Sequence, residues 1–127
     1  MSSDQAQVQS PLPLSVPFFY ILLALQDADR HGYAIINEVA ERTHGAVRLR
    51  TGTLYNAVRR MLGQGLIEEV AERPDPAIDD ERRRYYRATE AGRRVFRAEA
   101  TRLRQMLSHA GEAAVMASVV GNEPTTE

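Results

Sequence analysis

The sequence predicts a mainly α-helical fold that contains one small β-hairpin and ends in a long helix. Three observations predict it. Apolar residues recur every three or four positions in the first half of the chain, two short stretches of β-favouring residues flank a polar loop, and a seven-residue repeat runs along the C-terminal part. The chain has 127 residues, of which 43% are hydrophobic, and this size fits one domain.

The charges are balanced overall but unevenly placed. The formal net charge is −1, every basic residue is arginine, and residues 48–104 hold 14 arginines against nine acidic residues. A near-neutral protein with this distribution can present one basic face. Cysteine is absent, which excludes disulfides and thiolate nucleophiles. The longest apolar run, residues 16–25, is about half of the ~20 residues that a membrane span needs, so we expect a cytoplasmic protein without membrane contact.

The N-terminal part predicts a disordered arm followed by an apolar helix. Residues 1–13 are polar and lack periodicity. Ser15 is placed to cap a helix that has Pro17 in its first turn and continues to about Leu25. Because this helix is apolar nearly all round, it needs cover on more than one side, and a second subunit is a natural source of that cover.

Two shorter amphipathic helices follow. The first runs from about Tyr33 to Gly45, after a polar break at residues 27–32. Thr51 is expected to cap the second, which ends near Gly63 and keeps its apolar residues within about 100° of its circumference. The opposite side of this second helix carries Gly52, Thr53, Asn56, Arg59 and Arg60, with Tyr55 at the boundary.

The next stretch predicts a β-hairpin and then a long helix. Residues 66–72 and 84–88 favour extended structure and are expected to pair, whereas residues 73–83 between them are too polar and proline-rich to pack. Thr89 is a good N-cap for a helix over residues 89–120. A tail is expected at residues 121–127.

The long helix carries a heptad seam. Its members are Phe96, Leu103, Ala110 and Ala117, with Glu99, Met106, Ala113 and Val120 interleaved. A helix of about 30 residues extends ~45 Å, far past a body of this size. The pattern therefore favours a dimerisation helix over one that packs on its own domain, although Glu99 and Gly111 depart from it.

This order of elements is that of a winged helix-turn-helix domain, residues 14–88, followed by a dimerisation helix, residues 89–120. A helix fits the major groove of DNA. The helix that contains Asn56 could therefore bring this amide to an adenine edge, and Arg59 or Arg60 to guanine or phosphate. The alternative is that these residues form only the solvated face of an amphipathic helix.

Four motifs carry a resemblance to a known family. They are HGYAI at residues 31–35, GTLY at 52–55, LGQGLIE at 62–68 and RYYRATEAG at 84–92. In this order and spacing they resemble the PadR family of bacterial transcriptional regulators, and the single C-terminal helix resembles its shorter subgroup. Asn56 departs from the pattern, because the family usually has proline there.

The resemblance implies a homodimeric repressor that binds a palindromic operator in double-stranded DNA through residues 51–63 and a basic wing at 73–84. It also implies an aromatic small-molecule effector at the dimer interface, with plain interface core as the alternative. The candidate DNA-binding residues are Tyr33, Arg50, Thr51, Gly52, Thr53, Tyr55, Asn56, Arg59, Arg60, Arg82, Arg83 and Arg84. The candidate effector or interface residues are Phe18, Phe19, Leu22, Phe96, Leu103 and Met106.

Two other functional classes are alternatives to a DNA-binding regulator. An enzyme is not expected, because His31, His44 and His109 are scattered and no serine lies in a Gly-x-Ser-x-Gly setting. No catalytic residue, metal or cofactor is predicted, and residues 79–81 are interpreted as a solvated acidic run. A dimeric winged-helix module that binds a small molecule or a protein without contacting DNA stays open, and an acidic or mixed surface on the third helix would favour it.

Overall fold

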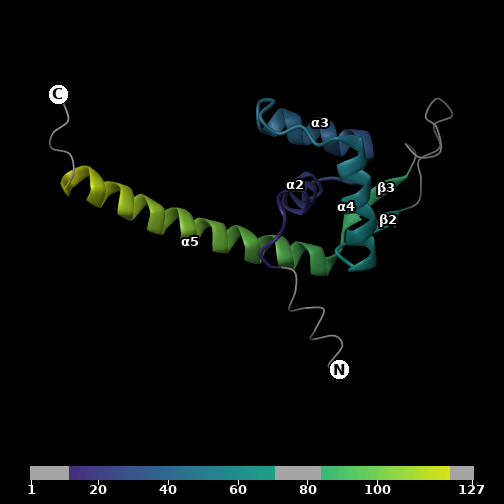
Figure 1. Cartoon of the computed structure of the whole chain (residues 1–127). Helices are drawn as coiled ribbons and strands as arrows, with labels where there is room; N and C mark the ends of the chain where they lie inside the picture. Colours follow the sequence, from purple (N-terminus) through teal and green to yellow (C-terminus); the bar gives the residue numbers. More distant parts are fainter. Residues whose placement is uncertain (1–11, 71–83, 121–127) are drawn as a thin grey trace, which may run out of the picture.

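The computed structural model describes residues 12–70 and 84–120 and confirms a mainly α-helical fold with a small antiparallel sheet (Figure 1). Most of the expected arm, the expected loop at 73–83 and the expected tail lie outside the described residues. Along the chain, the elements are α2 (Val16–Ala24), β1 (Arg30–His31), α3 (Gly32–Arg42), α4 (Thr51–Gly63), β2 (Ile67–Val70), β3 (Tyr85–Ala88) and α5 (Glu90–Val120).

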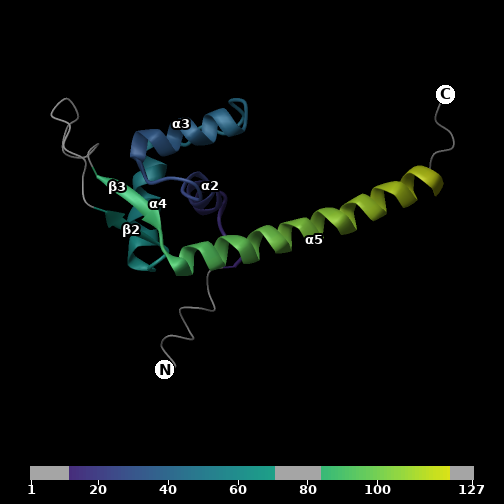
Figure 2. The same ribbon diagram turned by 180° about the vertical axis from the view of Figure 1, so that it is seen from behind.

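Helix α2 is the centre of the fold. The Ser15 hydroxyl accepts a hydrogen bond from the Phe18 N–H at 3.3 Å and Pro17 lies in the first turn, which confirms the predicted start. The helix packs against α3, α4 and α5 (Figures 1 and 2). Ile21 and Leu22 are fully buried within the single chain. The chain itself therefore supplies much of the cover that this apolar helix needs.

The core gathers around α2 and joins the other helices to the sheet. Its largest fully buried side chains are Ile21, Leu22, Ile35, Leu54, Met61, Ile67, Glu99 and Val39. Burying one large aliphatic side chain contributes about 1.5–3 kcal/mol, so these contacts are the main source of stability. They also fix α4 against α2 by its apolar side, which leaves the polar side of α4 at the surface.

Both α3 and α4 end in a Schellman motif. After α4, the Leu66 N–H donates to the Met61 carbonyl at 3.0 Å while Gly65 takes a φ of 75°. After α3, the Gly45 N–H donates to the Ala40 carbonyl at 2.7 Å. The positive φ of Gly65 is a conformation that favours glycine, and it accounts for the helix end expected here.

The start of α4 corrects one prediction. Arg50 is the N-cap and makes no side-chain capping hydrogen bond, and Thr51 is the first helical residue. The prediction that Thr51 caps the helix is therefore wrong by one position. Because a guanidinium has no acceptor atom, the N–H groups of the first turn receive no cap from the Arg50 side chain.

The sheet has three strands, in the order β1-β3-β2. Strands β2 and β3 pair antiparallel, with Ile67 opposite Ala88, which confirms the expected pairing. Strand β1 was expected only as a break between helices, yet Arg30 pairs with Tyr86 of β3. Two residues are too few to show the alternation of apolar and polar side chains that indicates a strand. The pairing of β1 therefore depends on the fold rather than on a local pattern.

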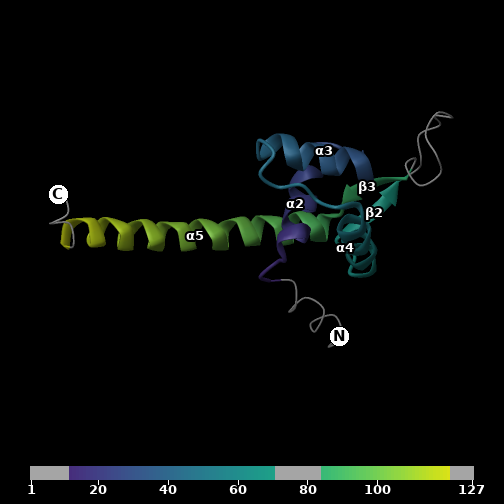
Figure 3. The ribbon, with the colours of Figure 1, turned by 45° about the horizontal axis from the view of Figure 1, so that its top comes forward.

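Helix α5 begins as predicted and then projects from the body (Figure 3). The Gly92 N–H donates to the Thr89 hydroxyl at 3.0 Å, which confirms the N-cap. Every residue from 103 to 118 is exposed in the single chain, over a length of about 24 Å. Within residues 12–70 and 84–120, no helix combines the length and apolarity that crossing a membrane requires.

The base of α5 holds the segment before α2 through a buried carboxylate. Glu99 is only 2% exposed, and its Oε2 accepts a hydrogen bond from the Leu14 N–H at 3.3 Å. Arg102, one turn further along, donates to both carboxylate oxygens at 2.8 Å. The hydrogen bonds from Arg102 lower the pKa of Glu99 despite the opposing effect of burial. A carboxylate in the heptad seam is thus explained by partners within the chain.

We expect acid to weaken this contact. A carboxyl group whose pKa is lowered by folding adds stability above its unfolded pKa of about 4.3 and loses it as the pH falls through the folded value. Glu99→Gln keeps an acceptor but removes the charge, so it should destabilise the chain at neutral pH and match the wild type in acid. Urea unfolding of both proteins over a series of pH values, from neutral to well below about pH 4, measures the difference. A difference that does not change with pH would contradict this role.

Candidate nucleic-acid interface

The polar side of α4 is exposed and free of acidic residues. Leu54, Val58 and Met61 on its other side are buried. No acidic residue occurs in residues 43–67, which contain four arginines. The fold thus brings the predicted polar residues of α4 together on one positively charged surface. These exposed residues are Gly52, Thr53, Asn56, Arg59 and Arg60.

The first turn of α4 is small and open. A Cβ on Gly52 would meet no atom within 4 Å, so packing inside the chain does not require glycine there. Thr51 and Thr53 on either side are exposed, as is Arg50. A helix N-terminus carries the positive end of the helix dipole and N–H groups that bind anions. This turn is therefore suited to close approach by a phosphate backbone.

The two arginines of α4 differ in their surroundings. The Arg60 guanidinium carbon lies 5.4 Å from the centre of the Phe18 ring, within the range of a cation–π contact with α2. Arg59 instead donates from Nη2 to the Asn56 Oδ1 at 3.5 Å, and both side chains are exposed. The sequence left open which arginine contacts a partner, and this difference favours Arg59.

Tyr55 lies between α4 and the start of α3. A Cβ on Gly32 would collide with the Tyr55 hydroxyl and come within 3.1 Å of Leu54, so glycine permits this close packing. The Tyr55 hydroxyl therefore lies against the first residue of α3. Tyr33, the next residue of α3, is exposed.

The hairpin carries one of its expected arginines within the described residues. Arg84 is exposed, and its Nε lies 3.6 Å from Oε2 of Glu69 on the neighbouring strand. Arg82 and Arg83, and the acidic run at residues 79–81, lie outside the described residues. On β3, Arg87 donates to both carboxylate oxygens of Asp29 at 3.1 and 2.9 Å, and these bonds raise the pKa of Arg87. The ion pair between Arg87 and Asp29 therefore connects strand β3 of the hairpin to the segment that leads into α3.

The six candidate effector or interface residues fall into three groups. Phe18 and Leu22 are buried in the core of the single chain. Phe19 and Phe96 are half-buried and stack with ring centres 5.2 Å apart. Leu103 and Met106 are exposed on the projecting part of α5. Only the second and third groups offer surface to a ligand or a second chain without unpacking the core.

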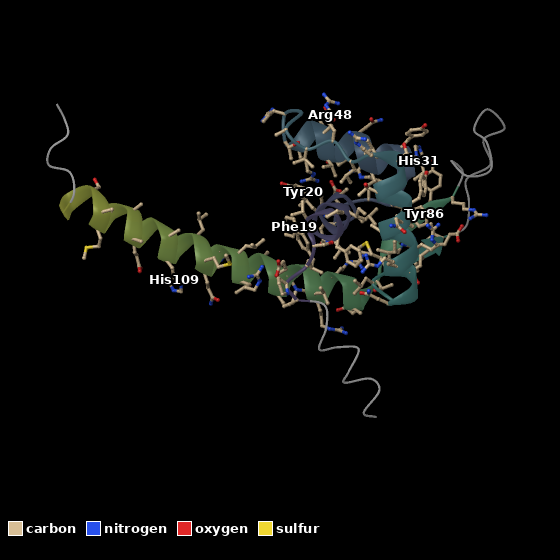
Figure 4. The ribbon with its side chains drawn as sticks, in the orientation of Figure 1. Phe19, Tyr20, His31, Arg48, Tyr86 and His109 are labelled. Atoms are coloured by element: carbon tan, nitrogen blue, oxygen red, sulfur yellow. The ribbon has the colours of Figure 1, made fainter. Side chains whose placement is uncertain are left out.

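Tyr20 belongs with the stacked rings although it was not among the candidates. The centres of the Tyr20 and Phe19 rings lie 5.6 Å apart in an edge-to-face arrangement (Figure 4). The run of three aromatic residues at 18–20 was the available signal. The histidines do not gather in one place, since His31 belongs to strand β1 and His109 lies on the projecting helix (Figure 4). Among the described residues, no three His, Cys, Asp or Glu side chains gather as metal ligands would.

Helices α2, α3 and α4 with the β2-β3 hairpin define the winged helix-turn-helix class. Within this class the chain belongs to the PadR-like family of transcriptional regulators, whose sequence pattern matches residues 21–98. A curated relative from Lysinibacillus sphaericus, named Uncharacterized protein X, is 34% identical over 73 residues. That match covers 58% of this chain and 64% of the relative.

Solved structures share the fold. A PadR family transcription regulator from Clostridium difficile matches with a TM-score of 0.66 and 25% identity, over 79% of this chain and 99% of that chain. A transcriptional regulator from Clostridium thermocellum matches with a TM-score of 0.64 and 23% identity, over 76% and 87%. PadR from Bacillus subtilis, solved in complex with operator DNA, matches with a TM-score of 0.58 and 17% identity, over 68% and 47%.

Proposed function

We propose that this chain is a cytoplasmic homodimeric repressor that binds a palindromic operator in double-stranded DNA. In this proposal residues 14–88 bind DNA, with α4 in the major groove and residues 73–84 as a basic wing, and residues 89–120 hold two chains together. The observation that carries it is the exposed, acid-free side of α4, where Arg59 and Asn56 follow a small, open first turn. The complex of Bacillus subtilis PadR with operator DNA supports the same use of the fold here.

The charge on α4 also separates this proposal from a winged-helix module that does not contact DNA. Such a module has no need of a basic surface on its third helix, and an acidic or mixed surface would suit it better. Helix α4 contains no acidic residue, and packing within the chain does not require glycine at position 52. Both features suit a surface approached closely by a polyanion.

The projecting part of α5 supports the homodimer. Met106 is 52% exposed and Leu107 is 71% exposed, and Leu103 lies on the same stretch. Large apolar side chains that remain exposed along one helix mark an interaction surface. Because Leu103 and Met106 follow the heptad pattern, a second copy of this helix would cover them with its own seam. The two copies would then present both α4 helices to one duplex, about 34 Å apart as a palindrome requires.

The stacked rings support an aromatic effector. Phe19, Tyr20 and Phe96 are half-buried where α2 meets the base of α5. Flat apolar ligands bind by stacking on or against such rings. A ligand placed there would alter the packing of α2 on α5, and through it the separation of the two α4 helices. This supports release of the operator by the effector.

The decisive experiment is a binding titration of the full chain with a DNA duplex. The duplex carries the sequence that lies upstream of the gene encoding this chain. We expect Arg59→Ala to weaken specific binding by about 1–3 kcal/mol, because one base or phosphate contact is lost, while Arg97→Ala on α5 removes an equal charge with little effect. Fluorescence anisotropy at several salt concentrations measures both. Binding that shows no sequence preference and no change with Arg59→Ala or Arg60→Ala would refute the proposal.

A further inference from the structure

Asn56 and Arg59 are neighbours on the exposed side of α4. They are three positions apart, the spacing at which helical side chains meet. The Arg59 Nη2 donates to the Asn56 Oδ1 at 3.5 Å. This contact takes one of the two acceptor positions of the Asn56 amide oxygen and leaves the NH₂ group available as a donor.

The contact determines which base edge the two side chains can match. An asparagine that reads adenine uses its oxygen to accept from N6 and its NH₂ to donate to N7. With one acceptor position of the oxygen taken by Arg59, the groups that the pair still offers are mainly N–H donors, from the Asn56 amide and the Arg59 guanidinium. Guanine presents two acceptors in the major groove, N7 and O6, whereas adenine presents one acceptor and one donor. A surface made mainly of donors therefore matches guanine better than adenine.

We infer that Asn56 is a positioning residue that directs Arg59 to a guanine in each operator half-site. The inference rests on the proposed function and replaces the expectation that Asn56 reads adenine itself. Arg60 does not compete for this role, since its guanidinium lies over the Phe18 ring. No acidic residue of α4 is present to hold Arg59 in another direction.

The first step of the test is selection of bound sequences from a randomised duplex library by the full wild-type chain. We expect a palindromic consensus with an invariant guanine in each half-site. Replacing that guanine by 7-deazaguanine removes the N7 acceptor and keeps base pairing, and it should weaken wild-type binding about tenfold. Arg59→Ala should bind both duplexes equally, and Arg97→Ala should behave as the wild type.

The second step separates positioning from direct contact. Asn56→Ala keeps Arg59 but removes the oxygen that orients it, so the ratio of affinities for guanine and 7-deazaguanine should fall toward that of Arg59→Ala. Asn56→Asp restores an acceptor and should recover the ratio, although its negative charge lowers affinity for both duplexes. Circular dichroism confirms that each variant is folded, as expected for exposed positions.

The outcomes distinguish this inference from the proposed function. A library from which no sequence is enriched would refute operator binding itself. An enriched palindrome with adenine at this position would overturn the guanine assignment and leave DNA binding intact. An Asn56→Ala variant that retains the full 7-deazaguanine effect would show that Arg59 is oriented without Asn56.

Discussion

Replacing Gly92 by alanine is expected to lower the free energy of unfolding by about 2–3 kcal/mol. Gly92 lies in the first turn of α5, and a Cβ there would collide with the Leu66 carbonyl oxygen. That carbonyl cannot move aside easily, because it accepts a hydrogen bond from the Thr89 N–H at 3.0 Å. The Thr89 hydroxyl also donates to the Gly65 carbonyl at 2.7 Å. The methyl group would therefore push α5 away from the turn that follows α4.

A matched control lies on the same helix. A Cβ on Gly111 would meet no atom within 4 Å in the single chain. Gly111→Ala should therefore leave stability unchanged or raise it by up to about 1 kcal/mol, since alanine favours helix more than glycine does. Urea unfolding at one fixed protein concentration compares the three proteins. Equal midpoints for Gly92→Ala and the wild type would show that α5 does not pack as described.

Charging the exposed heptad positions of α5 is expected to abolish the proposed dimer and, with it, most of the proposed affinity for an operator. The double substitution Leu103→Glu and Met106→Glu places carboxylates where the second copy is proposed to pack, and desolvating them is unfavourable. A single chain then binds one half-site, and the loss of the linked second site costs about 10²–10⁴-fold in affinity. Both residues are exposed in the single chain, so the fold itself should remain.

The control for this change is Ser108→Glu, which adds a carboxylate on the opposite side of α5 from the seam. Sedimentation velocity reports the oligomeric state, and anisotropy with the selected operator reports affinity. We expect Ser108→Glu to remain dimeric and to bind normally. If the double variant remained a dimer with unchanged affinity, the two chains would have to associate through another surface.

Local signals in the sequence predicted the helices well because their causes are local. Ser15 and Thr89 cap helices as expected, since a hydroxyl before a helical stretch acts on its own first turn. Strand β1 was not predictable in the same way, because two residues become a strand only when β3 lies beside them. Local propensity is strong where the interaction partner is nearby in the chain and weak where the fold supplies it.

The same distinction holds in the candidate site. The periodicity of α4 was enough to predict which side would be exposed, because the apolar residues of one helix define it. It could not distinguish Arg59 from Arg60, since the Phe18 ring that holds Arg60 belongs to another helix. Likewise, Glu99 departs from the apolar pattern of the heptad seam, and the sequence could not explain it because its partner Leu14 is distant in the chain.

Because the projecting helix is long, a small change of angle at its base moves its far end by a large distance. Glu99 and Arg102 lie at the pivot, where the last contacts with the body are made, and about 24 Å of helix extends beyond it. A tilt of about 10° at the pivot would displace the far end by ~4 Å, a shift comparable to the rise of one base pair. In the proposed dimer, small rearrangements where the rings stack would thus be magnified into a mismatch between the two α4 helices and the helical repeat of the duplex.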